Sequence, residues 1–205
     1  MPLILIGGGL LGFGVFWPGK FFFLAAAFFL FLALFVLNFF RDPERVVPSG
    51  PGVLVSPADG RVVEIRTEEE AGRSRQRISI FMSPLNVHVN RSPVAGSIRS
   101  IVYRKGSFHM ASKPEASVEN ESNTFTLESD DGEIVVRQIA GVLARRIVFW
   151  KNVGDRVERG ERVGMIKFGS RVDIMVPPDV TLSVKVGENV NAGSTIIGTR
   201  RATSS

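Results

Sequence analysis

The chain has 205 residues, with 25 basic and 20 acidic side chains, two histidines and no cysteine. The lack of cysteine excludes thiol catalysis and disulfide bonds, and two histidines are too few for a metal-binding histidine cluster, so we expect no metal site. All 20 acidic and 24 of the 25 basic residues follow residue 40. This modest basic excess suits anionic lipid headgroups better than nucleic acid, because basic patches interleaved with aromatic residues are lacking.

The first 40 residues have a composition typical of a membrane segment. Residues 21–40 form a run of 20 residues, mostly Phe, Leu and Ala, and Lys20 is the one charge before them. Such a run is long enough to cross a hydrocarbon core of about 30 Å. The shorter, glycine-rich stretch 2–17 either completes a helical hairpin or lies in the interface, and we favour the hairpin. No basic segment precedes it as in a signal peptide, so we assign residues 1–40 to a retained hydrophobic membrane anchor.

The charges around the apolar run predict its orientation. Arg41 and Arg45 follow it, whereas the turn before it offers only Lys20. Positive charge is enriched on the cytoplasmic side, so we expect residues 41–205 on that side of the cell membrane. Their length fits one hydrophobic core and a single catalytic domain, as a monomer or a homo-oligomer.

Beyond residue 48 the sequence alternates between short β-type runs and turns rich in Gly, Pro, Asp and Asn. No amphipathic helix of convincing length follows residue 41, and the polar stretch 111–123 predicts a loop or lid. The pattern predicts a mainly β fold, a compact sandwich or barrel behind a helical membrane anchor. The clearest predicted strands are 60–65, 77–81, 134–137 and 182–186.

Three polar side chains within this framework are candidates for chemistry. Asp59 lies in the turn 56–60, where its carboxylate either orients another side chain or caps the turn, the commoner role. In the stretch 81–91, alternation places His88 on a polar face, which favours acid/base or binding work. His109, the second histidine, is interpreted as a loop residue.

Two segments near the C-terminus, 153–160 and 186–193, have nearly the same sequence, VGDRVERG and VGENVNAG. They differ most in the next two residues, which are Glu161-Arg162 after the first segment and Ser194-Thr195 after the second. A Gly–Ser bond in a tight turn is a plausible place for a chain to attack its own peptide bond, because glycine is unhindered and the hydroxyl is a nucleophile. The sequence therefore indicates Gly193–Ser194 as the functional centre.

In combination, several motifs resemble the phosphatidylserine decarboxylase family in its short, membrane-associated form. Gly-Ser pairs also occur at Gly96, Gly106 and Gly169, but only Gly193–Ser194 precedes a threonine near the C-terminus, as the family's processing site does. The motifs, in order, are 56–60 (SPADG), 81–93, 118–121 (VENE), 168–170 (FGS) and 193–195 (GST).

The resemblance implies a proenzyme that makes its own cofactor. Ser194 would attack the Gly193 carbonyl, and elimination would divide the chain into 1–193 (the β chain) and 194–205 (the α chain), which stay associated. The former Ser194 would become a pyruvoyl group, form a Schiff base with phosphatidylserine, and accept electrons as CO₂ leaves to give phosphatidylethanolamine. His88 would donate the proton that completes the product.

One position departs from many longer members of the family. These carry a second histidine three residues after the counterpart of His88, paired with the aspartate and assigned to self-cleavage, whereas this chain has Arg91. Two hypotheses remain for self-cleavage. Either Asp59 acts on His88 directly, or cleavage depends mainly on backbone strain and on donors that polarise the Gly193 carbonyl.

Two other classes of function share part of the pattern. A biotinyl- or lipoyl-type carrier has hairpins with the same Val-Gly-Asp punctuation, but it needs an exposed lysine at a hairpin tip. The corresponding turn here is 169–171, with Lys167 set back from it. The other class is a non-catalytic, membrane-tethered β adaptor. Intact mass separates the three, because a carrier gains a group on lysine, an adaptor is unchanged and a decarboxylase is cut.

Overall fold

The computed structural model describes residues 20–70, 72–107, 119–130, 132–141, 146–167 and 169–200. The chain divides into two compact units, Met1–Arg41 and Asp42–Ser205. In the first unit, helix α2 (Lys20–Phe39) has a mean hydropathy of 2.6 and is long and apolar enough to cross a membrane. Its bounds match the predicted apolar run to within one residue. The stretch 2–17, expected to complete a hairpin, lies outside the described residues.

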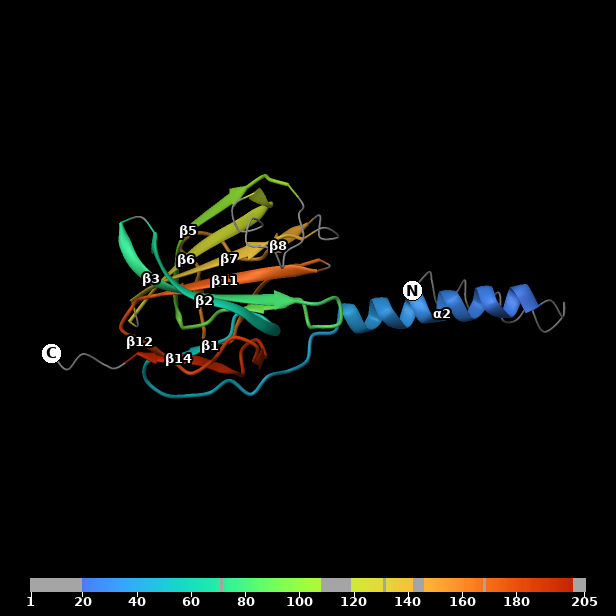
Figure 1. Ribbon diagram of the computed structural model, residues 1–205, viewed down its shortest axis with the longest axis horizontal. Coiled ribbons are helices and arrows are strands. Elements are labelled where there is room, and N and C mark those ends of the chain that lie inside the picture. Colours follow the sequence, from blue (N-terminus) through green and yellow to red (C-terminus); the bar gives the residue numbers. More distant parts are fainter. Residues whose placement is uncertain are drawn as a thin grey trace. The chain divides into compact units, whose positions relative to one another are not determined.

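The described elements of the second unit are all strands, which confirms the predicted mainly β fold (Figure 1). Their bounds are β1 Val53–Val55, β2 Gly60–Glu70, β3 Arg73–Met82, β4 Val89–Arg91, β5 Gly96–Arg104, β6 Ser122–Ser129, β7 Gly132–Ile139, β8 Ile147–Phe149, β9 Arg156–Val157, β10 Arg162–Ile166, β11 Ser170–Val176, β12 Val180–Leu182, β13 Asn189–Val190 and β14 Ile196–Arg200.

Three of the four predicted strands lie within β2, β3 and β7. The fourth prediction, 182–186, is wrong beyond Leu182, because β12 ends there and the chain turns toward β13. The predicted loop 111–123 ends too late, since β6 already begins at Ser122 and pairs with β7 and β5. Residues 111–118 and His109 lie outside the described part of the chain.

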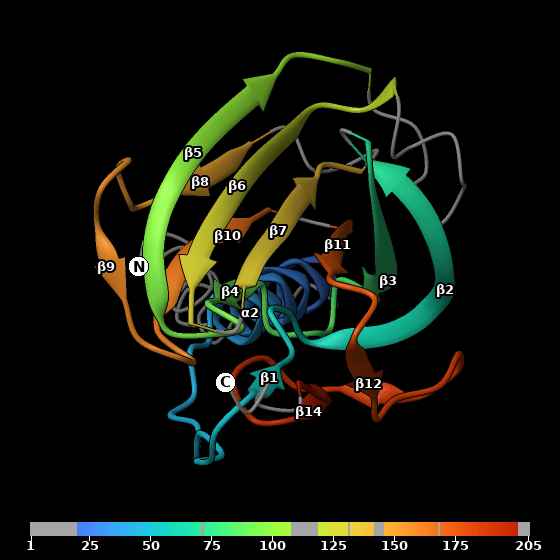
Figure 2. The same cartoon turned by 90° about the vertical axis from the view of Figure 1, so that its left-hand side faces the viewer.

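The largest sheet has eight strands in the order β13-β2-β3-β11-β7-β6-β5-β9, and all neighbours are antiparallel. Figure 2 shows that β5, β6, β7, β11, β3 and β2 follow one another around an arc. Two three-stranded sheets, β1-β14-β12 and β4-β10-β8, complete the unit. One apolar core joins the three sheets, with buried members such as Ile78, Ile174, Phe125, Ile197 and Val163.

The two edges of the large sheet have the same design. At one edge, the segment 186–193 pairs with β2 through β13, and at the other edge the segment 153–160 pairs with β5 through β9. In each case the carbonyl of one strand residue accepts from the amide of the first glycine of the segment. The amide of the same strand residue donates to the carbonyl of the residue after that glycine. The bonds are Gly187 N to Val62 O (2.8 Å), Val62 N to Glu188 O (2.9 Å), Gly154 N to Ile98 O (2.8 Å) and Ile98 N to Asp155 O (2.9 Å).

The two small sheets repeat the same design. The central strand, β14 or β10, comes directly after one of the two similar segments, and its glycine, Gly198 or Gly164, is paired on both sides. In each small sheet, one outer strand is followed in the sequence by a Ser-Pro pair and then by a strand of the large sheet. Ser56 follows β1 and precedes β2, and Ser92 follows β4 and precedes β5. Strands β1, β2, β12, β13 and β14 thus form one arrangement, which we call the Gly193 arrangement. Strands β4, β5, β8, β9 and β10 form its counterpart, the Gly160 arrangement.

Candidate active site

The turn 191–195 connects β13 to β14 and contains the Gly193–Ser194 bond. The amides of Ser194 and Thr195 both donate to the carbonyl of Asn191, at 3.2 and 3.0 Å, and the amide of Asn191 donates to the Thr195 hydroxyl at 2.9 Å. Gly193 has a φ of +73°, a conformation that favours glycine. The structure therefore shows the tight turn that the sequence predicts at this bond.

Ser56 holds this turn on both sides of Ser194. Its carbonyl accepts from the amide of Gly193 at 2.8 Å, and its amide donates to the carbonyl of Thr195 at 2.8 Å. Its own hydroxyl donates to the carbonyl of Ala58 at 2.7 Å, which fixes the turn before β2. Ser194 is half-buried between the two fixed points.

The Gly160 arrangement shows what is special about Ser194. There, Ser92 makes the same two backbone bonds, accepting from the amide of Gly160 and donating to the carbonyl of Glu161, both at 2.8 Å. Gly160 and Glu161 are consecutive residues, whereas the two residues that Ser56 holds are separated by Ser194. Thr195, not Ser194, is thus the counterpart of Glu161.

Side-chain bonds support this correspondence. The Glu161 carboxylate accepts from the amide of Glu158 at 2.8 Å, just as the Thr195 hydroxyl accepts from the amide of Asn191. Ser194 is therefore a one-residue insertion relative to the Gly160 arrangement. Hydrogen bonds that both arrangements share serve the fold, so an extra hydroxyl residue in one of them needs a different explanation.

Asp59 contacts the same turn from the loop before β2. Its Oδ1 accepts from the amide of Ala192 at 2.7 Å, and its Oδ2 lies 2.8 Å from Nη2 of Arg45. The side chain is 8% exposed. The carboxylate therefore bonds to residues outside its own turn, which favours the orienting role over turn capping. The Gly160 arrangement has Ala95 at this place, so the carboxylate, like Ser194, belongs to one arrangement only.

His88 is fully buried, and the expectation that it is presented on the polar face of a strand is wrong. The reason is a turn, in which the amide of Asn86 donates to the carbonyl of Ser83 and the Asn86 side chain accepts from the amide of Ser83. The turn interrupts the alternation, and Leu85 within it is exposed. Nδ1 of His88 lies 2.9 Å from the carbonyl oxygen of Asn86, which favours the ring with its proton on Nδ1.

Arg91, at the end of β4, lies beside the turn 191–195. Its amide donates to the carbonyl of Pro57 at 2.9 Å, and its guanidinium donates to the carbonyl of Gly160 at 2.9 Å and to Asp42 at 3.1 Å. It fills the space beside Gly193, because a Cβ built on this glycine would lie 2.8 Å from Cδ of Arg91. Burial lowers the pKa of Arg91, and the nearby Arg162 lowers it further, whereas Asp42 acts against this shift.

Comparison with known proteins decides between the classes of function. The family model for phosphatidylserine decarboxylase matches residues 32–198. A phosphatidylserine decarboxylase proenzyme of Solibacter usitatus is 50% identical over 171 residues, which cover 83% of this chain and 81% of the relative. The chain belongs to the phosphatidylserine decarboxylase family.

Other members of the phosphatidylserine decarboxylase family are similarly close. The phosphatidylserine decarboxylase proenzyme of Nitratidesulfovibrio vulgaris is 50% identical over 175 residues, covering 84% of this chain and 81% of its own. A putative archaetidylserine decarboxylase proenzyme of Methanosarcina acetivorans is 48% identical over 168 residues, covering 82% and 76%. The protein is thus a decarboxylase, a lyase, and the carrier and adaptor interpretations are not supported. The resemblance stated from the sequence is confirmed.

The arrangement brings together some of the predicted residues of the decarboxylase and separates others. Asp59, Gly193 and Ser194 meet at one turn, and the Asp59 carboxylate bonds to Ala192 and Arg45. Within the described residues, no bond joins Asp59 to His88. No group of three His, Cys, Asp or Glu side chains suitable for a metal occurs in that part of the chain either.

Ser56, Thr195 and Arg45 also belong to the candidate site, although their roles were not predicted from the sequence. One signal for Ser56 is visible in the sequence, because Ser-Pro followed three residues later by Gly occurs at both 56–60 and 92–96. The part of Arg45 has no such signal, since its partner becomes a neighbour only in the fold.

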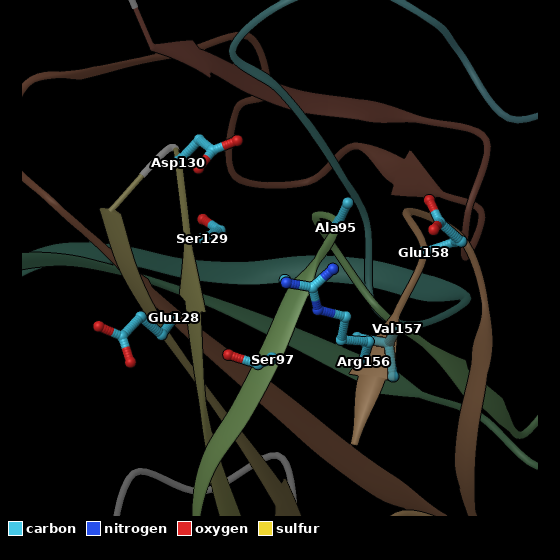
Figure 3. Close-up of a pocket in the computed structure, with 9 residues that line it drawn as sticks. Ala95, Ser97, Glu128, Ser129, Asp130, Arg156, Val157 and Glu158 are labelled. Carbon is cyan, nitrogen blue, oxygen red and sulfur yellow. The ribbon is translucent and has the colours of Figure 1, made fainter. Parts of the chain in front are cut away.

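A pocket of about 500 Å³ opens where β5 and β9 of the Gly160 arrangement meet the end of β6. The guanidinium of Arg156 extends into it, with Glu128, Asp130 and Glu158 around it (Figure 3). This hollow lies beside Ala95, the counterpart of Asp59. The hydrogen bonds around Ser194, and not this hollow, mark the candidate active site.

Proposed function

We propose that the protein is a phosphatidylserine decarboxylase proenzyme that cuts itself between Gly193 and Ser194 and then converts phosphatidylserine to phosphatidylethanolamine. Membership of the family supports the reaction. One observation carries the position of the cut, namely that Ser194 is inserted into a turn that is otherwise repeated in the Gly160 arrangement. Relatives named for phosphatidylserine and for archaetidylserine share a phosphoserine headgroup, so we take this headgroup as the recognised part of the lipid.

Self-cleavage begins with attack of the Ser194 hydroxyl on the carbonyl carbon of Gly193. The new C–O bond replaces the C–N bond of the peptide, and the hydroxyl proton goes to the released amine. The Cα of Ser194 then loses a proton while its Cβ–O bond breaks, which leaves a carboxylate on Gly193. The resulting enamine tautomerises to an imine. Water adds to the imine carbon, ammonia leaves, and the residue becomes a pyruvoyl group.

Several residues favour the first step. Ser56 fixes Gly193 and Thr195, so Ser194 has little freedom relative to the carbonyl it attacks, which lowers the entropic cost of reaction. Among the described residues, Asp59 is the one carboxylate that is hydrogen-bonded to the backbone of the turn 191–195. We assign it as the base that takes the hydroxyl proton of Ser194 and passes it on to the released amine.

We assign His88 to the second reaction, the decarboxylation of the substrate, as the proton donor. Once formed, the pyruvoyl group supplies a carbonyl that bonds to the substrate amine and takes up electrons as CO₂ leaves. Because Nδ1 of His88 faces the carbonyl of Asn86, its Nε2 is the atom that exchanges protons with the substrate carbon. The His88 carbonyl also accepts from the amide of Ile166 at 3.3 Å, which ties the histidine to β10.

The cut leaves the small chain, 194–205, held by strand pairing. β14 lies in this chain and is the central strand of the sheet β1-β14-β12, paired on both sides. The two chains therefore stay together after cleavage. We assign helix α2 as the membrane anchor and place the catalytic unit on the cytoplasmic side of the cell membrane, because Arg41 and Arg45 follow the helix.

Intact-mass and Edman analysis of the purified protein test the proposal. We expect two chains divided between Gly193 and Ser194, with the small chain blocked to Edman degradation because its amino group has become a ketone. Ser194→Ala should stay uncut and inactive, and so should deletion of Ser194, which gives the turn the length of its counterpart. Conversion of phosphatidylserine and archaetidylserine, followed by thin-layer chromatography, tests the headgroup. Full activity of an uncut wild-type chain would overturn the pyruvoyl assignment.

A further inference from the structure

The segment between helix α2 and β1 contacts Asp59 and Arg91, the two residues that lie beside the turn 191–195. We call residues 42–47 the strap. Nη2 of Arg45 lies 2.8 Å from the carboxylate of Asp59, and the guanidinium of Arg91 bonds to Asp42 and to the carbonyl of Pro43, both at 3.1 Å. Asp59 also accepts from the amide of Ala192, and Arg91 fills the space beside Gly193.

A second set of contacts docks the strap on β10. Arg162 contacts Asp42 at 2.5 Å and Glu44 at 2.7 Å. Hydrogen bonding to Glu44 and Asp42 raises the pKa of Arg162, and Arg162 in turn lowers the pKa of Glu44. Asp42 therefore lies between two arginines, and it fixes the guanidinium of Arg91 relative to β10.

Packing continues the contact as far as Gly160. This glycine has a φ of +78°, and a methyl group on it would lie 2.5 Å from Cγ2 of Val47. A methyl group on Gly193 would in turn lie 3.5 Å from the Cα of Gly160. Val47, Gly160 and Gly193 thus form a continuous line from the strap to the bond that is cut.

Stability alone does not explain the ion pair between Arg45 and Asp59. Their side chains are 15% and 8% exposed, and the cost of removing two charges from water offsets much of their attraction. The Gly160 arrangement folds in the same way with Ala95 in place of the aspartate. The pair therefore occurs beside the proposed cut and is not needed for the fold that the two arrangements share. This indicates that it takes part in self-cleavage.

We propose that the strap is a positioning element for self-cleavage, in which Arg45 orients the Asp59 carboxylate and Asp42 orients Arg91 against Gly193. This inference rests on the proposed cut between Gly193 and Ser194. Neither Arg45 nor Asp42 touches the reacting atoms, so both are positioning residues. Asp42 follows helix α2 by only a few residues in the sequence, so the segment that leaves the membrane helix also organises cofactor formation.

Pulse-chase translation of the full chain into phospholipid vesicles tests the strap. The uncut fraction is followed on gels for wild type, Arg45→Ala, Arg45→Lys and Asp42→Asn. Arg99→Ala is the matched control, because it removes an arginine from an exposed ion pair with Glu133. Thermal unfolding midpoints are measured for each variant in the Ser194→Ala background, where all chains are uncut and their folding can be compared directly.

We expect Arg45→Ala and Asp42→Asn to slow cleavage about tenfold or more, which corresponds to about 1.4 kcal/mol in the barrier. Arg45→Lys should recover part of the rate because it keeps the charge, and Arg99→Ala should match wild type. After cleavage is complete, decarboxylation per cut enzyme should fall far less than the rate of cleavage does. Wild-type cleavage rates in the strap variants, or a slowing that merely tracks lowered unfolding midpoints, would overturn the inference. A wild-type chain cut elsewhere, or a Ser194→Ala chain that is cut, would instead refute the proposed function.

Discussion

A methyl group built on Gly193 would lie 2.8 Å from Cδ of Arg91. This distance is shorter than real carbon–carbon contacts, so the arginine side chain fills the space beside the glycine. On the resemblance stated from the sequence, Arg91 takes the place of a second histidine. Its guanidinium is directed to Gly160 and Asp42, so it acts here through packing and orientation.

Gly193→Ala should impair both folding and self-cleavage. The φ of +73° alone costs about 1–2 kcal/mol for a residue with a side chain, and contact with Arg91 adds to this cost. Gly154→Ala is the matched control, since Gly154 has a φ of +94° and open space around it. Urea unfolding and a gel assay measure the two effects. Equal stability and equal cleavage in the two variants would show that the contact with Arg91 is unimportant.

His88→Ala and Asp59→Asn should separate use of the cofactor from its formation. We expect His88→Ala to cut itself, at least slowly, and to lose about 10²- to 10⁴-fold in kcat, the usual effect of removing a positioned general acid. Asp59→Asn should impair cleavage more than turnover. Cyanoborohydride trapping with phosphatidylserine, alongside a gel assay, measures both steps. Normal cleavage and normal decarboxylation by His88→Ala would remove this histidine from the mechanism.

Removal of residues 1–40 should release a soluble protein that still cuts itself. The strap and all strands remain in this fragment, and the apolar core lies within Asp42–Ser205. Its activity on bilayer substrate should fall, because the helix no longer concentrates it at the membrane. Membrane fractionation and a vesicle assay provide the measurements. If the fragment stays firmly in the membrane fraction, helix α2 is not the main anchor.

The ion pair between Glu44 and Arg162 predicts a pH dependence of strap docking. Hydrogen bonding to Arg162 lowers the pKa of Glu44 from its ordinary value of 4.5, so the stabilisation is present above pH 4.5 and is lost as the pH falls through the lowered value. The difference in urea midpoint between wild type and Glu44→Gln should be small at pH 7, because the pair is exposed, and should vanish in acid. A difference that grows as the pH falls would contradict this sign.

Local sequence was enough to predict several features of the protein. The apolar run of residues 21–40 predicts helix α2, because hydrophobicity over 20 residues is itself the requirement for crossing a bilayer. Alternating runs such as 77–81 predict strands, since side chains in a strand point to opposite faces in turn. The Gly193–Ser194 turn was predicted too, because glycine is the residue that adopts a positive φ without strain.

Tertiary structure decided which groups surround that turn. The partner of Asp59 is the amide of Ala192, 133 residues away in the sequence, and the burial of His88 depends on a turn that the alternating pattern concealed. Ser194 is recognised as an insertion only when the hydrogen bonds of Ser56 are compared with those of Ser92. Local periodicity reports which face of an element is apolar, whereas strand pairing across the chain fixes which polar groups meet. For this reason, the sequence located the bond that we propose is cut, and the fold revealed the residues that hold it.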